Sequence, residues 1–119
     1  MEVHFFSEID GQLIQYKSKA SLNNNVLSFY ECLDGNKNLV NVFINDETIR
    51  IIRDGEISSD FLFESAKETK AVYETKYGTS DFLIYTKELN ITKNKIFISY
   101  ETIFDKKNAS NVKIWLIIK

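Results

Sequence analysis

The sequence predicts an all-β protein, and three observations carry this prediction. Short runs of alternating apolar and polar residues recur along nearly the whole chain, and Gly, Asn and Asp residues separate them. About ten such runs at a spacing of ~8 to 12 residues are typical of an antiparallel barrel or sandwich. The chain also contains no proline, which removes one usual means of blunting the edges of a sheet. A closed barrel has no edges, so it suits this composition.

The predicted strands follow one another with short turns between them. They cover residues 2–9, 13–20, 26–33, 39–44, 48–53, 57–64, 70–77, 81–87, 95–104 and 111–118. Asp10-Gly11, Asp34-Gly35 and Asp54-Gly55 supply residues that tight turns need. The best helix candidate, residues 64–71, has good helix formers but lacks apolar residues at helical spacing. We therefore expect a hairpin loop with about one helical turn there.

Length and composition predict one domain over residues 1–119. A chain of this length buries roughly two thirds of its unfolded surface, and 9 Phe, 6 Tyr and 1 Trp supply a core. The net charge is −2 and the basic residues are spread thinly, which argues against nucleic acid as a partner. Cys32 is the only cysteine, so an intrachain disulfide and a multi-cysteine metal site are excluded. We interpret it as a buried thiol.

The N-terminal sequence MEVHFFSEID has no basic leader, and no stretch approaches the ~20 apolar residues of a membrane span. We therefore expect a cytoplasmic protein without a membrane partner.

The alternation in the middle of the chain places an arginine inside the protein. Successive strand residues point to opposite faces, and Arg53 shares its face with Ile49 and Ile51. Arg50 falls on the opposite, mostly polar face. We therefore predict that Arg53 points inward and that Arg50 is solvated.

Several short segments resemble the YwiB-like family of small bacterial proteins. These segments are Phe29-Tyr30-Glu31, Ile51-Ile52-Arg53-Asp54-Gly55, Phe63, Tyr73-Glu74-Thr75-Lys76-Tyr77-Gly78, Tyr85-Thr86 and Ile98-Ser99-Tyr100. The resemblance implies an up-and-down β-barrel of calycin type, related in shape to lipocalins, in a family whose biochemical role is uncharacterised. Ser65-Ala66 stands where the family pattern leads us to expect a glycine, and Lys76 where we expect a proline.

In such a barrel alternate strands run the same way, so the third, fifth and seventh strands end at one rim. The predicted inward residues near those ends, with one from the ninth strand, form a polar cluster. Its members are Glu31, Arg53, Tyr73, Thr75 and Tyr100.

Two interpretations of this cluster remain open. In the first, Arg53 and Glu31 form an enclosed ion pair that closes the barrel end, and the rarity of unpaired buried charge favours it. In the second, Arg53 offers its fork of donors to a carboxylate or phosphate on a ligand. The apolar part of that ligand would lie among Phe61, Phe63 and Ile84. A free cavity inside the barrel would favour the second interpretation.

Catalysis has little support in the sequence. His4 is the only histidine and lies in an alternating N-terminal run, where an outward position is expected. The chain has no nucleophile elbow, glycine-rich phosphate loop or metal-ligand spacing, so we predict no enzyme, no cofactor and no metal.

The alternative function is a protein-interaction or structural module with a barrel filled by side chains. Its outer surface around Trp115 and Tyr85 would bind a partner. Both faces of the last strand are largely apolar, so a second copy of the chain, forming a homodimer, is one candidate for covering the face of Trp115.

Overall fold

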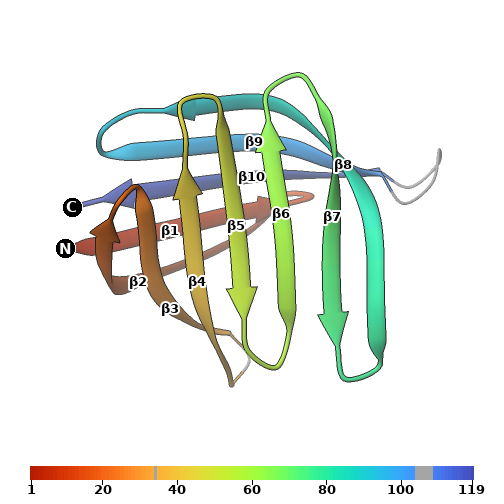
Figure 1. The fold of residues 1–119 in the computed structure, drawn as a ribbon, viewed down its shortest axis with the longest axis horizontal. Helices are drawn as coiled ribbons and strands as arrows, with labels where there is room; N and C mark the ends of the chain where they lie inside the picture. Colours follow the sequence, from red (N-terminus) through yellow and green to blue (C-terminus); the bar gives the residue numbers. More distant parts are fainter. Residues whose placement is uncertain (34, 104–108) are drawn as a thin grey trace.

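In a computed structural model that describes residues 1–33, 35–103 and 109–119, the chain forms a closed antiparallel barrel of ten strands (Figure 1). The strands are β1 (Glu2–Ile9), β2 (Gln12–Asn23), β3 (Val26–Leu33), β4 (Asn36–Ile44), β5 (Thr48–Asp54), β6 (Ser58–Glu64), β7 (Glu68–Thr75), β8 (Gly78–Ile91), β9 (Lys95–Ile103) and β10 (Ala109–Ile118). The predicted turn residue Asp34 and the predicted strand end at Phe104 lie outside the described residues.

The topology is up-and-down, as predicted. Each strand pairs with the next one along the chain, and β10 closes the barrel on β1, where Val3 lies opposite Ile118. The described residues contain no helix, and hence none long and apolar enough to cross a membrane. The predictions of an all-β fold and of about ten antiparallel strands are therefore confirmed.

The barrel consists of two sets of strands that cross at a steep angle. The antiparallel strands β1, β9 and β10 lie along one axis, and the antiparallel strands β4 to β7 lie across it (Figure 1). Two strands turn the corners between the sets. β2 pairs with β1 over residues 12–19 but with β3 only over residues 20–23. β8 pairs with β7 over its first half and with β9 over its second.

β8 is longer than the sequence predicted. The expected strand ended at residue 87, but a register shift between Thr86 and Glu88 lets pairing with β9 continue to Ile91. A bulge of this kind inserts a residue and reverses the alternation beyond it, so the period-two pattern breaks although the strand does not. The bulge also bends the strand, which helps β8 to turn its corner.

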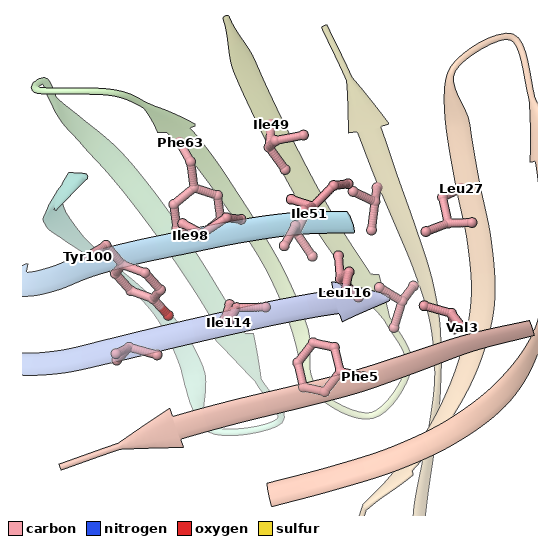
Figure 2. Packing of buried hydrophobic residues seen from close by; sticks show 14 of the residues in the cluster. Val3, Phe5, Leu27, Ile49, Ile51, Phe63, Ile98, Tyr100, Ile114 and Leu116 are labelled. Atoms are coloured by element: carbon pink, nitrogen blue, oxygen red, sulfur yellow. The ribbon is translucent and has the colours of Figure 1, made fainter. Parts of the chain in front are cut away.

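One end of the barrel is filled by side chains. Inward residues of both sets of strands interdigitate there, among them Leu27, Ile49, Phe63, Ile98 and Leu116, each at most 1% exposed. Figure 2 shows these residues meeting between the strands. The other end is occupied differently, and it holds the polar residues that the sequence singled out.

Two local predictions were wrong. Cys32 is exposed, because it lies on the outward face of β3 next to the inward Glu31. The loop after β6 is a hairpin loop, as predicted, but it holds no helical turn; the Lys67 amide donates to the Glu64 carbonyl there. Ala66 in this turn has a φ of 59°, a left-handed conformation that glycine adopts more easily. This is the place where the family pattern led us to expect a glycine.

Candidate functional site

The ends of β3 and β5 bring an ion pair to the open end of the barrel. Arg53 Nε donates to Glu31 Oε1 across 2.9 Å, and the Glu31 side chain is only 2% exposed. The guanidinium carbon of Arg53 lies 5.9 Å from the centre of the Phe5 ring on β1, so this cation also contacts an aromatic face. Arg53 and Glu31 thus point inward, as the alternation predicted, and they form the ion pair of the first interpretation.

Two further side chains complete the hydrogen bonds of Glu31. The Tyr16 hydroxyl on β2 donates to Glu31 Oε2 across 2.6 Å, and Asn38 Nδ2 on β4 donates to Oε1 across 3.4 Å. Tyr16 lies in the part of β2 that has no backbone pairing with β3. Its hydrogen bond therefore links the two strands at the point where the backbone ladder between them is missing.

Gly55 leaves room for this arrangement. A Cβ atom at position 55 would lie 2.0 Å from Asn38 Oδ1 and 2.8 Å from the Lys37 carbonyl oxygen. Asn38 is buried, and its Oδ1 has no hydrogen-bond partner among the described residues. The glycine after Asp54 is thus needed for close packing against Asn38, which in turn contacts Glu31.

A cavity of about 390 Å³ opens beside the ion pair. Its polar lining comes from Ser7, Glu31, Asn36, Asn38, Arg53 and Ser59. The apolar and aromatic residues are Phe5, Ile9, Ile14, Ile57, Phe61, Tyr73, Tyr100, Val112 and Ile114. We call this space the mouth cavity. Its volume lies at the lower end of the range for small-molecule sites, about 300–1,000 Å³.

The structure gathers four of the five predicted cluster residues around the mouth cavity. Glu31, Arg53, Tyr73 and Tyr100 line it, although Tyr73 is 38% exposed and lies at the rim. Thr75 does not line it. Its hydroxyl accepts a hydrogen bond from the Tyr77 amide across 3.1 Å, so it stabilises the turn after β7 instead.

Burial keeps the two inner tyrosines protonated. Burial raises the pKa of Tyr100 to about 12, although the nearby Arg53 charge acts in the opposite direction. Burial, and then the hydrogen bond to Glu31, raise the pKa of the Tyr16 hydroxyl well above its usual range. Both hydroxyls therefore stay protonated, as hydrogen-bond donors, to a higher pH than an exposed tyrosine does.

The sequence did not reveal Tyr16 and Asn38 as members of this site. Tyr16 lies on the inward face of β2 with Ser18 and Ala20, and this pattern of small and aromatic residues was a usable signal. Asn38 was missed because the predicted strand began at residue 39, whereas β4 begins at Asn36.

The described residues hold no cluster of three or more His, Cys, Asp or Glu side chains that could bind a metal ion. The site is therefore a polar corner on an apolar cavity, with one cation, one carboxylate and protonated tyrosines. Such an arrangement is suited to binding.

The chain resembles known proteins over nearly its full length. The model of the family DUF1934, a domain of unknown function, matches residues 5–116. The crystal structure of the ywiB protein from Bacillus subtilis is similar, with a TM-score of 0.70 and 20% sequence identity over 99% of this chain and 90% of that one. At this identity the similarity concerns the fold. No curated protein matches the chain.

Proposed function

Because the chain belongs to DUF1934, a family of unknown function, we propose from its geometry that it binds a small, partly apolar anion in the mouth cavity. The observation that carries this proposal is the presence of free space beside an arginine with unused donors. Arg53 makes one hydrogen bond to the described residues, and it does so through Nε. Its two terminal nitrogens have no hydrogen-bond partner among those residues.

The ion pair supports this use of Arg53. Glu31 holds the guanidinium through Nε, so its far edge is fixed in orientation and offers two parallel N–H donors. A carboxylate or phosphate accepts such a pair of hydrogen bonds. Glu31 also repels an anion, but Tyr16 and Asn38 donate to its oxygens and reduce that repulsion.

The apolar lining supports a ligand with a hydrophobic body. Phe61 and Tyr100 lie with their rings edge to face, 6.3 Å apart, and Phe5 and Ile114 line the cavity as well. Burying apolar ligand surface against such walls supplies about 25 cal/mol per Å². A ligand of this kind would place its charged end at Arg53 and its body toward Tyr100.

The alternative, a barrel end closed for structural reasons alone, shares the same ion pair. It is favoured by the link from β2 through Tyr16 to Glu31, which holds the two sets of strands together. The two functions differ in the cavity, since a closing device does not need one.

We place this binding in the cytoplasm. The exposed, unpaired thiol of Cys32 suits a reducing compartment.

The test is native mass spectrometry of the protein purified from its own cells. We expect a mass above that of the 13.9 kDa chain, and denaturation should release an anion of low molecular weight. The variant Ile57→Trp would fill the mouth with an indole and should lose the extra mass. Ile52→Trp adds the same group on the outward face of β5 and should retain it.

The proposal fails if the wild-type protein carries no small molecule, or if Ile57→Trp and Ile52→Trp retain the same one. Binding of an aromatic sulfonate dye provides a second measurement, with the same pair of variants. Dye fluorescence should rise with the wild type and with Ile52→Trp, and much less with Ile57→Trp.

A further inference from the structure

The outer face of β9 and β10 carries another cavity, which shares no lining residue with the mouth cavity. It measures about 270 Å³ and is lined by Asn90, Thr92, Lys95, Phe97, Lys113 and Trp115. We call it the Trp115 groove. Phe97 and Trp115 are cross-strand neighbours with ring centres 5.4 Å apart, and both are half-buried. Phe6, the neighbour of Trp115 on β1, extends this apolar row.

Two lysines stand at opposite ends of the aromatic pair. Lys95 lies two residues from Phe97 on β9, and Lys113 lies two residues from Trp115 on β10. Both are exposed, and neither has an ion-pair partner among the described residues. Glu8, the cross-strand neighbour of Lys113, forms no ion pair with it. Two free cations thus flank an aromatic surface.

The opposite side of the barrel is different. Several basic residues there have carboxylate partners, in the pairs Arg50–Asp60, Lys67–Glu64 and Lys70–Asp81. Tyr85, which the sequence grouped with Trp115, lies between Glu68 and Glu101 and away from the groove. Lys95 and Lys113 differ from these paired residues because they lie beside an aromatic pair and have no ion-pair partner among the described residues.

We propose that the Trp115 groove binds an acidic segment of another protein, with one apolar side chain flanked by carboxylates. The register gives the spacing. Lys113 lies opposite Ser99, four residues from Lys95, so the two lysines are ~14 Å apart along the strands. Carboxylates four residues apart in an extended peptide are ~13 Å apart, with the central residue above the rings.

The geometry argues against other occupants. A second copy docked face to face would bring its own unpaired lysines against Lys95 and Lys113. A partner strand cannot extend the sheet here, because β9 and β10 are already paired on both edges. A long polyanion such as a nucleic acid would meet repulsion from a chain with net charge −2, whereas a short acidic segment requires only the local lysines.

The test uses Trp115, the only tryptophan of the chain, as the reporter. A blocked peptide with the central order glutamate–serine–phenylalanine–serine–glutamate should change the tryptophan fluorescence. Its dissociation constant should increase as the salt concentration rises. In the variant Lys95→Gln/Lys113→Gln its dissociation constant should rise at least tenfold. The matched variant Lys67→Gln/Lys76→Gln removes two exposed lysines elsewhere and should bind as the wild type does.

Several results would overturn the proposal. One is no fluorescence change at millimolar peptide, and another is equal binding by the two double variants. A peptide with lysines in place of the glutamates should not bind, so its binding would also contradict the inference. A single-stranded oligonucleotide is tested in the same way. If it binds the wild type more tightly than the acidic peptide does, and if the variant Lys95→Gln/Lys113→Gln no longer binds it, the partner is nucleic acid and not an acidic protein segment. Circular dichroism of both variants checks that the barrel is intact.

Discussion

Two arginines on β5 form ion pairs in opposite environments. Arg50 Nε donates to Asp60 across 2.8 Å on the outer face, and Arg53 Nε donates to Glu31 across 2.9 Å inside the mouth. The outer side chains are 49% and 36% exposed, and the inner ones 21% and 2%. The outer pair is bidentate, because a terminal nitrogen of Arg50 also donates to Asp60, whereas Arg53 uses Nε alone. The pair with fewer hydrogen bonds is therefore the one with less access to water.

The difference concerns what happens when a pair is broken. On the outer face water solvates whichever charge is left, so such a pair contributes about 0–1 kcal/mol. Inside, the remaining charge has little water, and loss of one partner costs about 3–5 kcal/mol even where the pair itself adds little. The inner pair is therefore a strong constraint on which residues the mouth tolerates.

The largest expected effect comes from Arg53→Met. The substitution leaves the Glu31 carboxylate buried without its cation, and the free energy of unfolding should fall by about 3–5 kcal/mol. Arg50→Met on the outer face should cost less than about 1 kcal/mol. Urea unfolding at neutral pH measures both. The double variant Glu31→Gln/Arg53→Met should recover part of the loss, and similar losses for the two single variants would contradict the comparison.

High pH provides the next largest effect, through Tyr100 beside the inner pair. Its pKa is about 12 in the folded protein against 10.0 when unperturbed, so only the unfolded chain ionises between these values. Stability from this group is present below pH 10 and is lost as the pH rises to 12, by about 2–3 kcal/mol. The pKa of Tyr16 is also raised in the folded protein, so ionisation of Tyr16 lowers stability at high pH as well.

Unfolding at a series of alkaline pH values should show this loss. Tyr100→Phe should reduce its steepness, while Tyr77→Phe at an exposed turn should retain it. The prediction is wrong if phenolate absorbance shows that Tyr100 titrates together with the exposed tyrosines in the folded protein.

A smaller effect is expected at Gly55, which lets Asn38 approach the inner pair. In Gly55→Ala the new methyl group meets Asn38 Oδ1 and the Lys37 backbone, and overpacking of this kind costs about 1–3 kcal/mol. Asp54→Ala, at the exposed neighbouring position, should change stability by less than about 0.5 kcal/mol. Thermal unfolding measures the loss of stability in each variant. Equal losses in Gly55→Ala and Asp54→Ala would mean that Asn38 moves aside freely and would contradict the prediction.

The smallest effect belongs to the outer pair. The hydrogen bond from Arg50 holds the pKa of Asp60 below its usual value. A lowered carboxylate pKa stabilises the protein above the unfolded pKa of 3.8, and the stabilisation is lost as the pH falls through the folded value. Asp60→Asn should therefore cost less than about 1 kcal/mol at neutral pH and still less in concentrated salt. A loss as large as that of Arg53→Met would remove the distinction between the two faces.

The alternation of residues predicted much of this structure because each strand has one dry face. It placed Arg50 and Arg53 on opposite sides of β5, and the up-and-down order then brought Glu31 to the same rim as Arg53. These inferences need only the direction of each side chain and the direction of each strand.

The rest depended on register and on strand ends, which a period of two does not fix. Nothing in the pattern of β2 indicates that its ladder with β3 stops after four residue pairs, and this gap is what brings Tyr16 to Glu31. Thr75 has the predicted parity, yet it lies at the last residue of β7 and is used by the following turn.

The pairing of β1 with β10 has a consequence for how the protein acquires its shape. It joins residues 3–9 to residues 112–118, and the Asp10 carboxylate accepts a hydrogen bond from the Asn111 amide, 101 positions away. Hairpins between neighbouring strands form within about 1–10 μs, whereas contacts between distant parts of a chain form slowly because a long loop must first close. The curved sheet should therefore assemble hairpin by hairpin, with the joining of the two terminal strands as the late and rate-limiting event.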